Sequence, residues 1–401
     1  MYRNRAWALL PFLFLLAWAW LQAQSQSPAD QVERFRRMSL DAEAKGLAEP
    51  YRGITASGTV RPGLYSIRST GVSTEPVRAA ADKFLAALTA EQRAKTVFPV
   101  DDVEWRKWMN QDFYVRQGVG FLEMSEAQKE AAFGLMQSSL SARGLKLSRD
   151  IMRLNYTLGE LNNNDFVRYG EWRYWITVMG KPSKTEPWGW QMDGHHLIIN
   201  YFVLGDQVVM SPVFLGSEPV IATSGKYKGT SILQEEQRQG LEMVRSLDDA
   251  QRKKAVLEVS KTGNNNLTEA FKDNVVLDYA GVRVSELDAA HRERLLKLVE
   301  LYVSNMDDGH ARVKMEEVRK HAGETYFAWI GGTADDSVYY YRIHSPVVLI
   351  EFDHQRPVGL RHLAANPNLP NHEHIHCVVR TPNGNDYGKD LLRLHYQQQP
   401  H

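Results

Sequence analysis

The sequence Trp188-Gly-Trp-Gln-Met-Asp-Gly-His-His-Leu-Ile-Ile-Asn200 combines aromatic residues, glycines, one carboxylate and two adjacent imidazoles in one short segment. Runs rich in aromatic and β-branched residues are typical of β-strands. We therefore expect this segment to be a strand that carries the chemical centre of the protein, with the rest of the fold arranged around it.

Strand alternation would give the two histidines different surroundings. His196 would stand at the edge of an aromatic wall formed by Trp188 and Trp190, which we expect to contact a ligand. His195 would lie on the opposite face beside Asp193, whose carboxylate can orient the ring or transfer a proton. The competing interpretation is that His196 is a hydrogen-bonded core residue and His195 a surface residue, because histidine is intermediate in burial.

The pattern before this segment predicts helices, and the pattern after it predicts further strands. Apolar residues at helical spacing indicate two helices between 77 and 98. Ser125 and Gln128 form a capping box for a helix that ends near Ala142, and another helix is expected from Leu147 to Leu161. Three strand-like runs follow, at 171–179, 188–204 and 207–215.

The second half of the chain repeats this order, which indicates a divergent internal duplication. Trp190 to Tyr201 aligns with Tyr341 to Phe352, and Leu88 to Arg93 aligns with Leu247 to Arg252. We expect an α+β architecture of two similar halves with approximate two-fold symmetry, each with helices followed by an antiparallel three-stranded meander. One continuous sheet and two packed sheets both satisfy the pattern, and similarity by composition alone is the competing interpretation.

These patterns divide the chain into four parts. They are a signal peptide at 1–23, an N-terminal arm with short strands at 24–76, a first α+β half at 77–220 and a second at 225–400.

The start of the chain predicts export. Arg3 and Arg5 precede an apolar run from Ala6 to Leu21, which is the pattern of a secretory signal peptide. The run is shorter than the roughly 20 residues of a spanning helix, and Pro11 interrupts it. We therefore expect a periplasmic or secreted protein with no stable membrane span after cleavage.

Composition narrows the classes of partner. The 48 basic and 48 acidic residues balance, so no net charge draws the protein to nucleic acid. Cys377 is the single cysteine, which excludes an intramolecular disulfide and a cysteine-rich zinc site. We expect a small-molecule substrate or ligand and no nucleic acid.

A second group of histidines alternates along the segment His372-Glu-His-Ile-His-Cys-Val-Val-Arg380. On a strand, the three imidazoles and Arg380 would line one face, where Arg380 could bind a ligand. Neutral imidazoles two residues apart can reach one metal ion, for which we expect zinc ahead of copper, iron or nickel. A polar row facing solvent is the competing interpretation, because no fourth ligand is evident.

The two copies differ at the candidate site, which favours one composite site over two equivalent ones. His195 and His196 align with Pro346 and Val347. The predicted metal ligands are therefore drawn from both halves: His374 and His376, together with His195 or His196. Glu218 follows a strand in a turn and is either a general base or an ordinary loop carboxylate.

Several of these segments resemble a bacterial family of exported proteins known as a domain of unknown function, DUF3500. The resemblance covers most of the chain after the signal and implies no reaction, cofactor or catalytic residue. The segments are 58–74, Trp188-x-Trp-x-x-x-Gly-His-His-Leu197, Phe214-x-Gly-x-Glu-Pro219, and His374-x-His-x-x-x-Arg380 followed by Asn385-Asp-Tyr-Gly388.

Two functions remain in competition at this point. The leading hypothesis is a metal-dependent, hydrolase-like enzyme, in which histidines hold an ion that activates water and Asp193 or Glu218 moves the proton. The rival is a non-catalytic protein that binds a small ligand or metal ion between its halves. No serine-hydrolase elbow, phosphate loop, zinc-protease helix or dinucleotide fingerprint is found.

Overall fold

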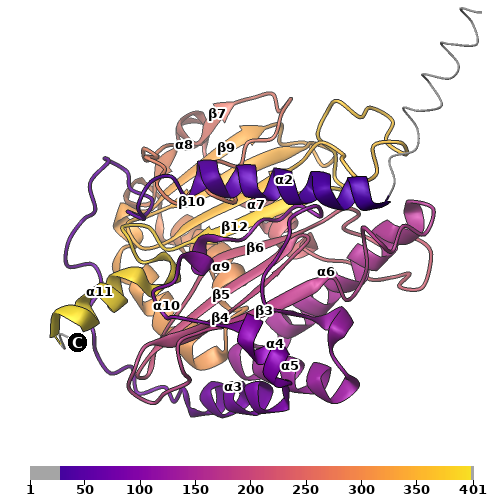
Figure 1. Ribbon diagram of the computed structural model, residues 1–401. Coiled ribbons are helices and arrows are strands. Elements are labelled where there is room, and N and C mark those ends of the chain that lie inside the picture. Colours follow the sequence, from indigo (N-terminus) through magenta and orange to yellow (C-terminus); the bar gives the residue numbers. More distant parts are fainter. Residues whose placement is uncertain (1–27, 399–401) are drawn as a thin grey trace, which may run out of the picture.

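The computed structural model describes residues 28–398 of the 401-residue chain (Figure 1). The signal peptide expected at 1–23 lies outside the described residues. The described part contains ten α-helices and one mixed sheet of twelve strands. None of the described helices combines the length and the apolar composition that crossing a membrane requires. The protein is thus a mixed α and β structure with a single continuous sheet, one of the two arrangements that the sequence allowed.

The elements have the following bounds. The α-helices are α2 (Pro28–Gly46), α3 (Glu75–Ala87), α4 (Ala90–Thr96), α5 (Glu126–Ser139), α6 (Ala142–Leu161), α7 (Gln234–Ser246), α8 (Asp249–Ala255), α9 (Ala289–Val303), α10 (Asp308–Lys320) and α11 (Lys389–Gln398). The strands are β1 (Val97–Phe98), β2 (Val119–Gly120), β3 (Tyr174–Met179), β4 (Trp188–Gly194), β5 (Leu197–Leu204), β6 (Gln207–Ser217), β7 (Val256–Glu258), β8 (Val282–Arg283), β9 (Tyr326–Gly331), β10 (Tyr339–His344), β11 (Leu349–His354) and β12 (Ile375–Arg380).

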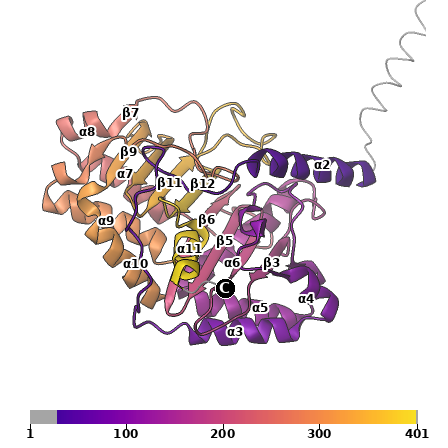
Figure 2. The same cartoon turned by 60° about the vertical axis from the view of Figure 1, so that its left-hand side comes forward.

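The strands run in the order β1-β3-β4-β5-β6-β12-β11-β10-β9-β7, with β2 beside β3 and β8 beside β9. Strands β3 to β6 form one antiparallel meander, and β9 to β12 form another. At the centre β6 and β12 pair antiparallel, from Ile375 opposite Ser217 to Val379 opposite Val213. Figure 2 shows this pair between α3, α4 and α5 on one side and α8 and α9 on the other. The sheet therefore brings the last strands of the two halves into direct contact.

Each meander has four strands, not the three that the sequence predicted. The run at 188–204 was expected to be one strand, but it divides into β4 and β5 because the chain reverses at His195 and His196. The expectation of a continuous strand from Trp188 to Asn200 was therefore wrong, and the assignment of faces beyond Gly194 fails with it.

Corresponding parts of the two halves make corresponding contacts. Thr89 and Asp248 cap α4 and α8, each in a capping box with the glutamine three residues on. Each of these helices leads into a short strand, β1 or β7, that lies parallel to β3 or β9. Because a capping box is a local signal, the sequence predicted both the helix at Thr89 and the one at Ser125.

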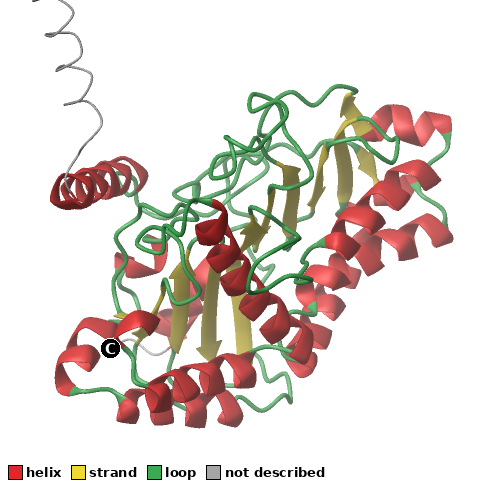
Figure 3. Cartoon of the chain, turned by 90° about the vertical axis from the view of Figure 1, so that its right-hand side faces the viewer, coloured by secondary structure: helices red, strands yellow, loops and turns green. Residues whose placement is uncertain are grey.

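The two faces of the sheet are covered differently. On one face, helices bury Trp188, Trp190 and Tyr341 in the main hydrophobic core. On the other face, irregular segments cover a smaller core that includes Phe202 and Phe214. Figure 3 shows most helices along one face and the loops over the other. We call these the helix face and the loop face.

The segment between α2 and α3 contains no regular strand. Short strands were expected at 51–55 and 63–67, but only Thr55 makes an isolated bridge, to Val276. Gly53 and Gly63 have φ angles of 91° and 75°, which are incompatible with an extended strand. The expected strands were wrong because glycines turn the chain at both places.

Candidate metal centre

His195 and His196 form a two-residue turn between β4 and β5, closed by the pairing of Gly194 with Leu197. His196 has a φ of 62°, in the left-handed region that histidine enters more readily than most residues do. Its backbone is fixed on both sides. The His196 N–H donates to the carbonyl of Asn110 at 3.2 Å, and its carbonyl accepts from Gly216 N at 2.9 Å.

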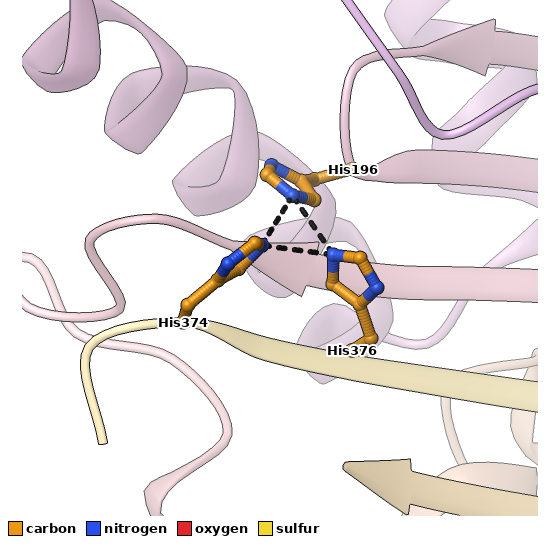
Figure 4. Close-up of side chains that lie close together, drawn as sticks. All are labelled: His196, His374 and His376. Carbon is orange, nitrogen blue, oxygen red and sulfur yellow. Dashed lines mark hydrogen bonds between the residues drawn. The ribbon is translucent and has the colours of Figure 1, made fainter. Parts of the chain in front are cut away.

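Three imidazoles converge on the loop face where the halves meet (Figure 4). The Nε2 atom of His196 lies 3.2 Å from Nε2 of His374 and 3.1 Å from Nε2 of His376. The Nε2 atoms of His374 and His376 are 2.9 Å apart. The three residues are 5%, 3% and 6% exposed, so the cluster is shielded from bulk solvent. A single ion can reach all three nitrogens.

The pairing of β6 with β12 creates this convergence. His376 lies opposite Gly216 in the sheet register. A Cβ atom at Gly216 would lie 3.3 Å from Cδ2 of His196, so the absence of a side chain there leaves space for the ring. The pairing of β6 with β12 therefore places His376 beside His196 and leaves space for the His196 ring.

The remote nitrogens of two rings have acceptors that fix the tautomer. Nδ1 of His374 lies 2.7 Å from the carbonyl oxygen of Arg356. Nδ1 of His376 lies 2.7 Å from a carboxylate oxygen of Glu269. Both acceptors lack a hydrogen to donate, so each Nδ1 carries the hydrogen and each Nε2 presents a lone pair.

Burial disfavours the protonated form of His196 and of His374. It lowers the pKa of His196 well below its usual value, and the neighbouring His195, His376 and His374 act in the same direction. It also lowers the pKa of His374 well below the usual value, with His376 adding to the effect. Burial alone would raise the pKa of Glu269, but the neighbouring His376 holds it below its usual value.

His195 lies beside the cluster and does not join it. Its ring stacks on that of His196 with centroids 4.0 Å apart. Its Nδ1 lies 2.8 Å from Oδ1 of Asn155, whose amide nitrogen is committed to the carbonyl of Gly170. Burial lowers the pKa of His195 to about 4. Of the two adjacent histidines, only His196 presents its nitrogen to the other rings.

The two acids chosen from the sequence have other partners. Asp193 Oδ1 accepts from Nε of Arg116 at 2.9 Å, and burial raises its pKa to about 6 against the charge of that arginine. Glu218 accepts backbone N–H bonds of 2.7–3.1 Å from residues 358–360. Burial raises the pKa of Glu218 even so. Its nearest approach to His374 is 3.7 Å, on the Nδ1 side of the ring, away from the cluster.

The two tryptophans expected to contact a ligand lie on the helix face, opposite the cluster. Trp188 donates from Nε1 to the carbonyl of Ser183 at 3.1 Å, and Trp190 donates to Oγ of Ser139 at 3.1 Å. Both side chains are fully buried. Strand alternation predicted correctly that Trp188 and Trp190 share a face of the sheet, but it did not predict that helices cover that face.

His372 and Arg380 lie near the cluster histidines in the sequence, but neither side chain joins the cluster. The strand begins only at Ile375, and His372 Nε2 lies 3.1 Å from the carbonyl of Asp336. Arg380 is 0% exposed and is bonded to Asp273 and Asp386 at 2.9 and 3.2 Å. The predicted row of three histidines with Arg380 is therefore reduced to His374 and His376 at the site.

Sequence reasoning missed the residues that hold the rings from behind. Glu269 lies in a polar loop, and Arg356 contributes only a backbone carbonyl. Neither is part of a spacing pattern with the histidines, so only the tertiary structure identifies them.

Comparisons with known proteins identify the family and no activity. A family model described as a protein of unknown function (DUF3500) matches residues 70–389, which include every residue of the cluster. No curated protein and no solved structure matches the chain.

Proposed function

The chain belongs to the DUF3500 family of proteins of unknown function, and we propose that it is a metalloprotein whose His196, His374 and His376 bind one divalent ion. We further propose that the ion is zinc and that it activates water for a hydrolytic reaction.

The contact between His374 and His376 carries the proposal. Their Nε2 atoms lie 2.9 Å apart, yet both present lone pairs, so neither can donate a hydrogen bond to the other. A proton on Nε2 of His374 would create an imidazolium, and burial lowers the pKa of that ring. An unmade bond between buried polar groups costs about 1–3 kcal/mol. A metal cation removes the conflict because neutral imidazole binds it through this lone pair.

The spacing of the three nitrogens suits zinc. Zinc binds imidazole nitrogen at about 2.0–2.1 Å in a tetrahedral arrangement, which separates the ligand nitrogens by about 3.3 Å. The observed separations of 2.9, 3.1 and 3.2 Å are within a few tenths of an ångström of that value. Imidazole ligands suit zinc, together with copper, iron and nickel, and zinc is the only one of these without redox chemistry.

The ligand count favours catalysis over a structural role. Structural zinc sites are closed by four protein ligands, whereas catalytic sites have three and keep one position for water. Among the described residues, the group that can share an ion contains three histidines and no fourth histidine, cysteine or acid. A bound zinc lowers the pKa of its water to about 7 and so generates a nucleophile at neutral pH.

The site's surroundings support this chemistry through Glu269. A carboxylate on the far nitrogen of a metal-binding histidine orients the ring and increases its basicity. Asp193 and Glu218 are engaged by Arg116 and by backbone N–H groups, so neither acid is assigned the role of proton acceptor.

Replacing zinc by Co²⁺ tests the open position. The cobalt form should absorb in the visible range, and added azide or a hydroxamate should shift that spectrum by taking the fourth position. A cobalt spectrum that does not respond to either anion would favour the rival function, a non-catalytic metal-binding protein.

We also propose export and duplication. Arg3, Arg5 and the apolar run that follows support cleavage near residue 23 and a periplasmic or secreted location. The equivalent capping boxes, the two four-stranded meanders and the parallel contacts of β1 and β7 support an origin by internal duplication with approximate two-fold symmetry. N-terminal sequencing of the mature protein tests the first idea, and superposition of β3–β6 on β9–β12 tests the second.

A further inference from the structure

We propose that Arg380 is a positioning residue of the metal centre: it fixes the backbone that carries Glu269, and Glu269 orients His376. This inference rests on the proposed metal-binding function. Arg380 and His376 both belong to β12 and both face the loops. They are connected through the long loop between β7 and β8, residues 259–281, which lies over the loop face.

Arg380 uses every N–H group that it has. Nε donates to the carbonyl of Thr268 at 3.0 Å, and Nη2 donates to the same carbonyl at 2.8 Å. Nη2 also donates to the carbonyl of Glu269 at 3.0 Å. Nη1 bonds to Asp273 and Asp386 at 2.9 and 3.2 Å. The two carboxylates fix the guanidinium, and the guanidinium in turn fixes two consecutive backbone carbonyls.

A second charged residue holds the same stretch of backbone from its other side. Glu351 of β11 accepts the N–H of Leu267 at 2.9 Å and the N–H of Thr268 at 3.0 Å. Glu351 and Arg380 are both fully buried. Residues 267–269 are therefore held by opposite charges on neighbouring strands, one at the N–H groups and the other at the carbonyls.

This clamp determines where the carboxylate of Glu269 lies. Its Oε1 atom accepts from Nδ1 of His376 at 2.7 Å and from Nδ2 of Asn266 at 2.9 Å. The side chain is 28% exposed, so packing alone does not hold it in this position. Arg380 anchors the backbone of Glu269 and so limits where its carboxylate can lie. The carboxylate in turn orients the His376 ring through one hydrogen bond.

Arg106 provides a control that distinguishes a positioning role of Arg380 from a general contribution to the stability of the fold. Arg106 is also buried and donates to Asp273, from Nε at 2.8 Å. Its other hydrogen bonds go to the carbonyls of Glu49 and Gly46, and none goes to Thr268 or Glu269. Substitution of Arg106 therefore disturbs the same buried charge network but leaves the hydrogen bonds from Arg380 to the carbonyls of Thr268 and Glu269 in place.

The test is the zinc affinity of the metal-free protein, measured by competition with a chromophoric chelator. E269Q removes the charge and E269D withdraws the carboxylate, and each should weaken zinc binding about 10- to 100-fold. R380K should weaken it by a similar factor, whereas R106K should not. The visible spectrum of the cobalt form should change in E269Q and R380K and stay the same in R106K.

A double variant decides whether Arg380 acts through Glu269. If it does, E269Q/R380K binds zinc no more weakly than E269Q alone. Wild-type affinity in both Glu269 variants would overturn the inference, and so would an R380K effect that persists in full in the E269Q background. If R380K does not fold, D386N takes its place, because it removes one of the two carboxylates that fix the Arg380 guanidinium; wild-type zinc affinity in D386N would then overturn the inference. A wild-type protein that binds no zinc would instead refute the metal centre itself.

Discussion

His196 and His376 come from opposite halves of the chain, yet their Nε2 atoms lie 3.1 Å apart on the loop face of the sheet. The pairing of β6 with β12 brings them together, and Gly216 leaves room for the ring of His196. The predictions below follow from this junction.

Two histidines of the same row should behave differently. H374A should lose the metal ion because it removes one of three ligands. H372A should retain it, because His372 contacts Gln237 and the carbonyl of Asp336 and stays outside the cluster. Metal analysis of the two purified variants checks this. Equal metal content in both would contradict the assignment.

Two adjacent histidines give a second contrast. H196Q should abolish zinc binding, whereas H195Q should keep one ion per chain, because Nδ1 of His195 is committed to Asn155 and its ring only stacks on the cluster. Isothermal titration of the metal-free variants with Zn²⁺ measures both. A loss of binding in H195Q would make His195 a ligand.

A methyl group at Gly216 should damage the site. Its Cβ would lie 2.5 Å from the carbonyl oxygen of Ile375 and 3.3 Å from His196 Cδ2. G216A should lower the free energy of unfolding by about 1–3 kcal/mol and weaken zinc binding. G134A is the matched control, because nothing lies within 4 Å of that Cβ. In the middle of α5 it should stabilise the protein by about 1 kcal/mol. Equal zinc affinity in G216A and wild type would argue against the role of Gly216.

Stability should fall in acid partly through His344, which is distinct from the metal centre. Burial lowers the pKa of His344 to about 3, and the charge of Arg342 acts in the same direction. Below the unfolded value of about 6.5 the unfolded state binds a proton that the folded state does not, so stability decreases as pH falls. Between pH 7.5 and pH 5, H344N should lose about 2 kcal/mol less than wild type.

Urea unfolding at the two pH values measures this difference. The exposed His362 provides the control variant H362N, which should follow the wild type. An unchanged pH dependence in H344N would mean that His344 takes up its proton in the folded state.

The sequence predicted those parts of the fold that depend on local signals. Capping at Thr89 and Ser125 requires only a hydroxyl and a glutamine three residues on, so both helices were expected where they occur. Pairing of β6 with β12 was beyond the sequence, because alternation sets the faces of a strand and not its neighbours. The one continuous sheet therefore came only from the structure.

The candidate site was predicted only in part, again because a residue pattern indicates the faces of a strand and not its neighbours. His196, His374 and His376 belong to segments whose residue pattern is typical of strands, but neither of the two turn residues, His195 and His196, is a glycine or asparagine that would signal a hairpin. The length of the run from Trp188 to Leu204 was the available warning, because strands are usually about 5–6 residues long. Glu269 belongs to a loop that is bonded to the sheet through Glu351, Asp353 and Arg380, and no spacing in the sequence records its contact with His376.

The most direct test of the central claim is the metal content of the mature protein, purified without an affinity tag or chelator. Elemental analysis by mass spectrometry should find about one zinc per wild-type chain and almost none in H374A/H376A. Circular dichroism should show that both proteins are folded. A chelator should lower the melting temperature of the wild type and leave that of the double variant unchanged. Wild-type protein that carries no metal, and that takes up no zinc when it is offered, would contradict the account.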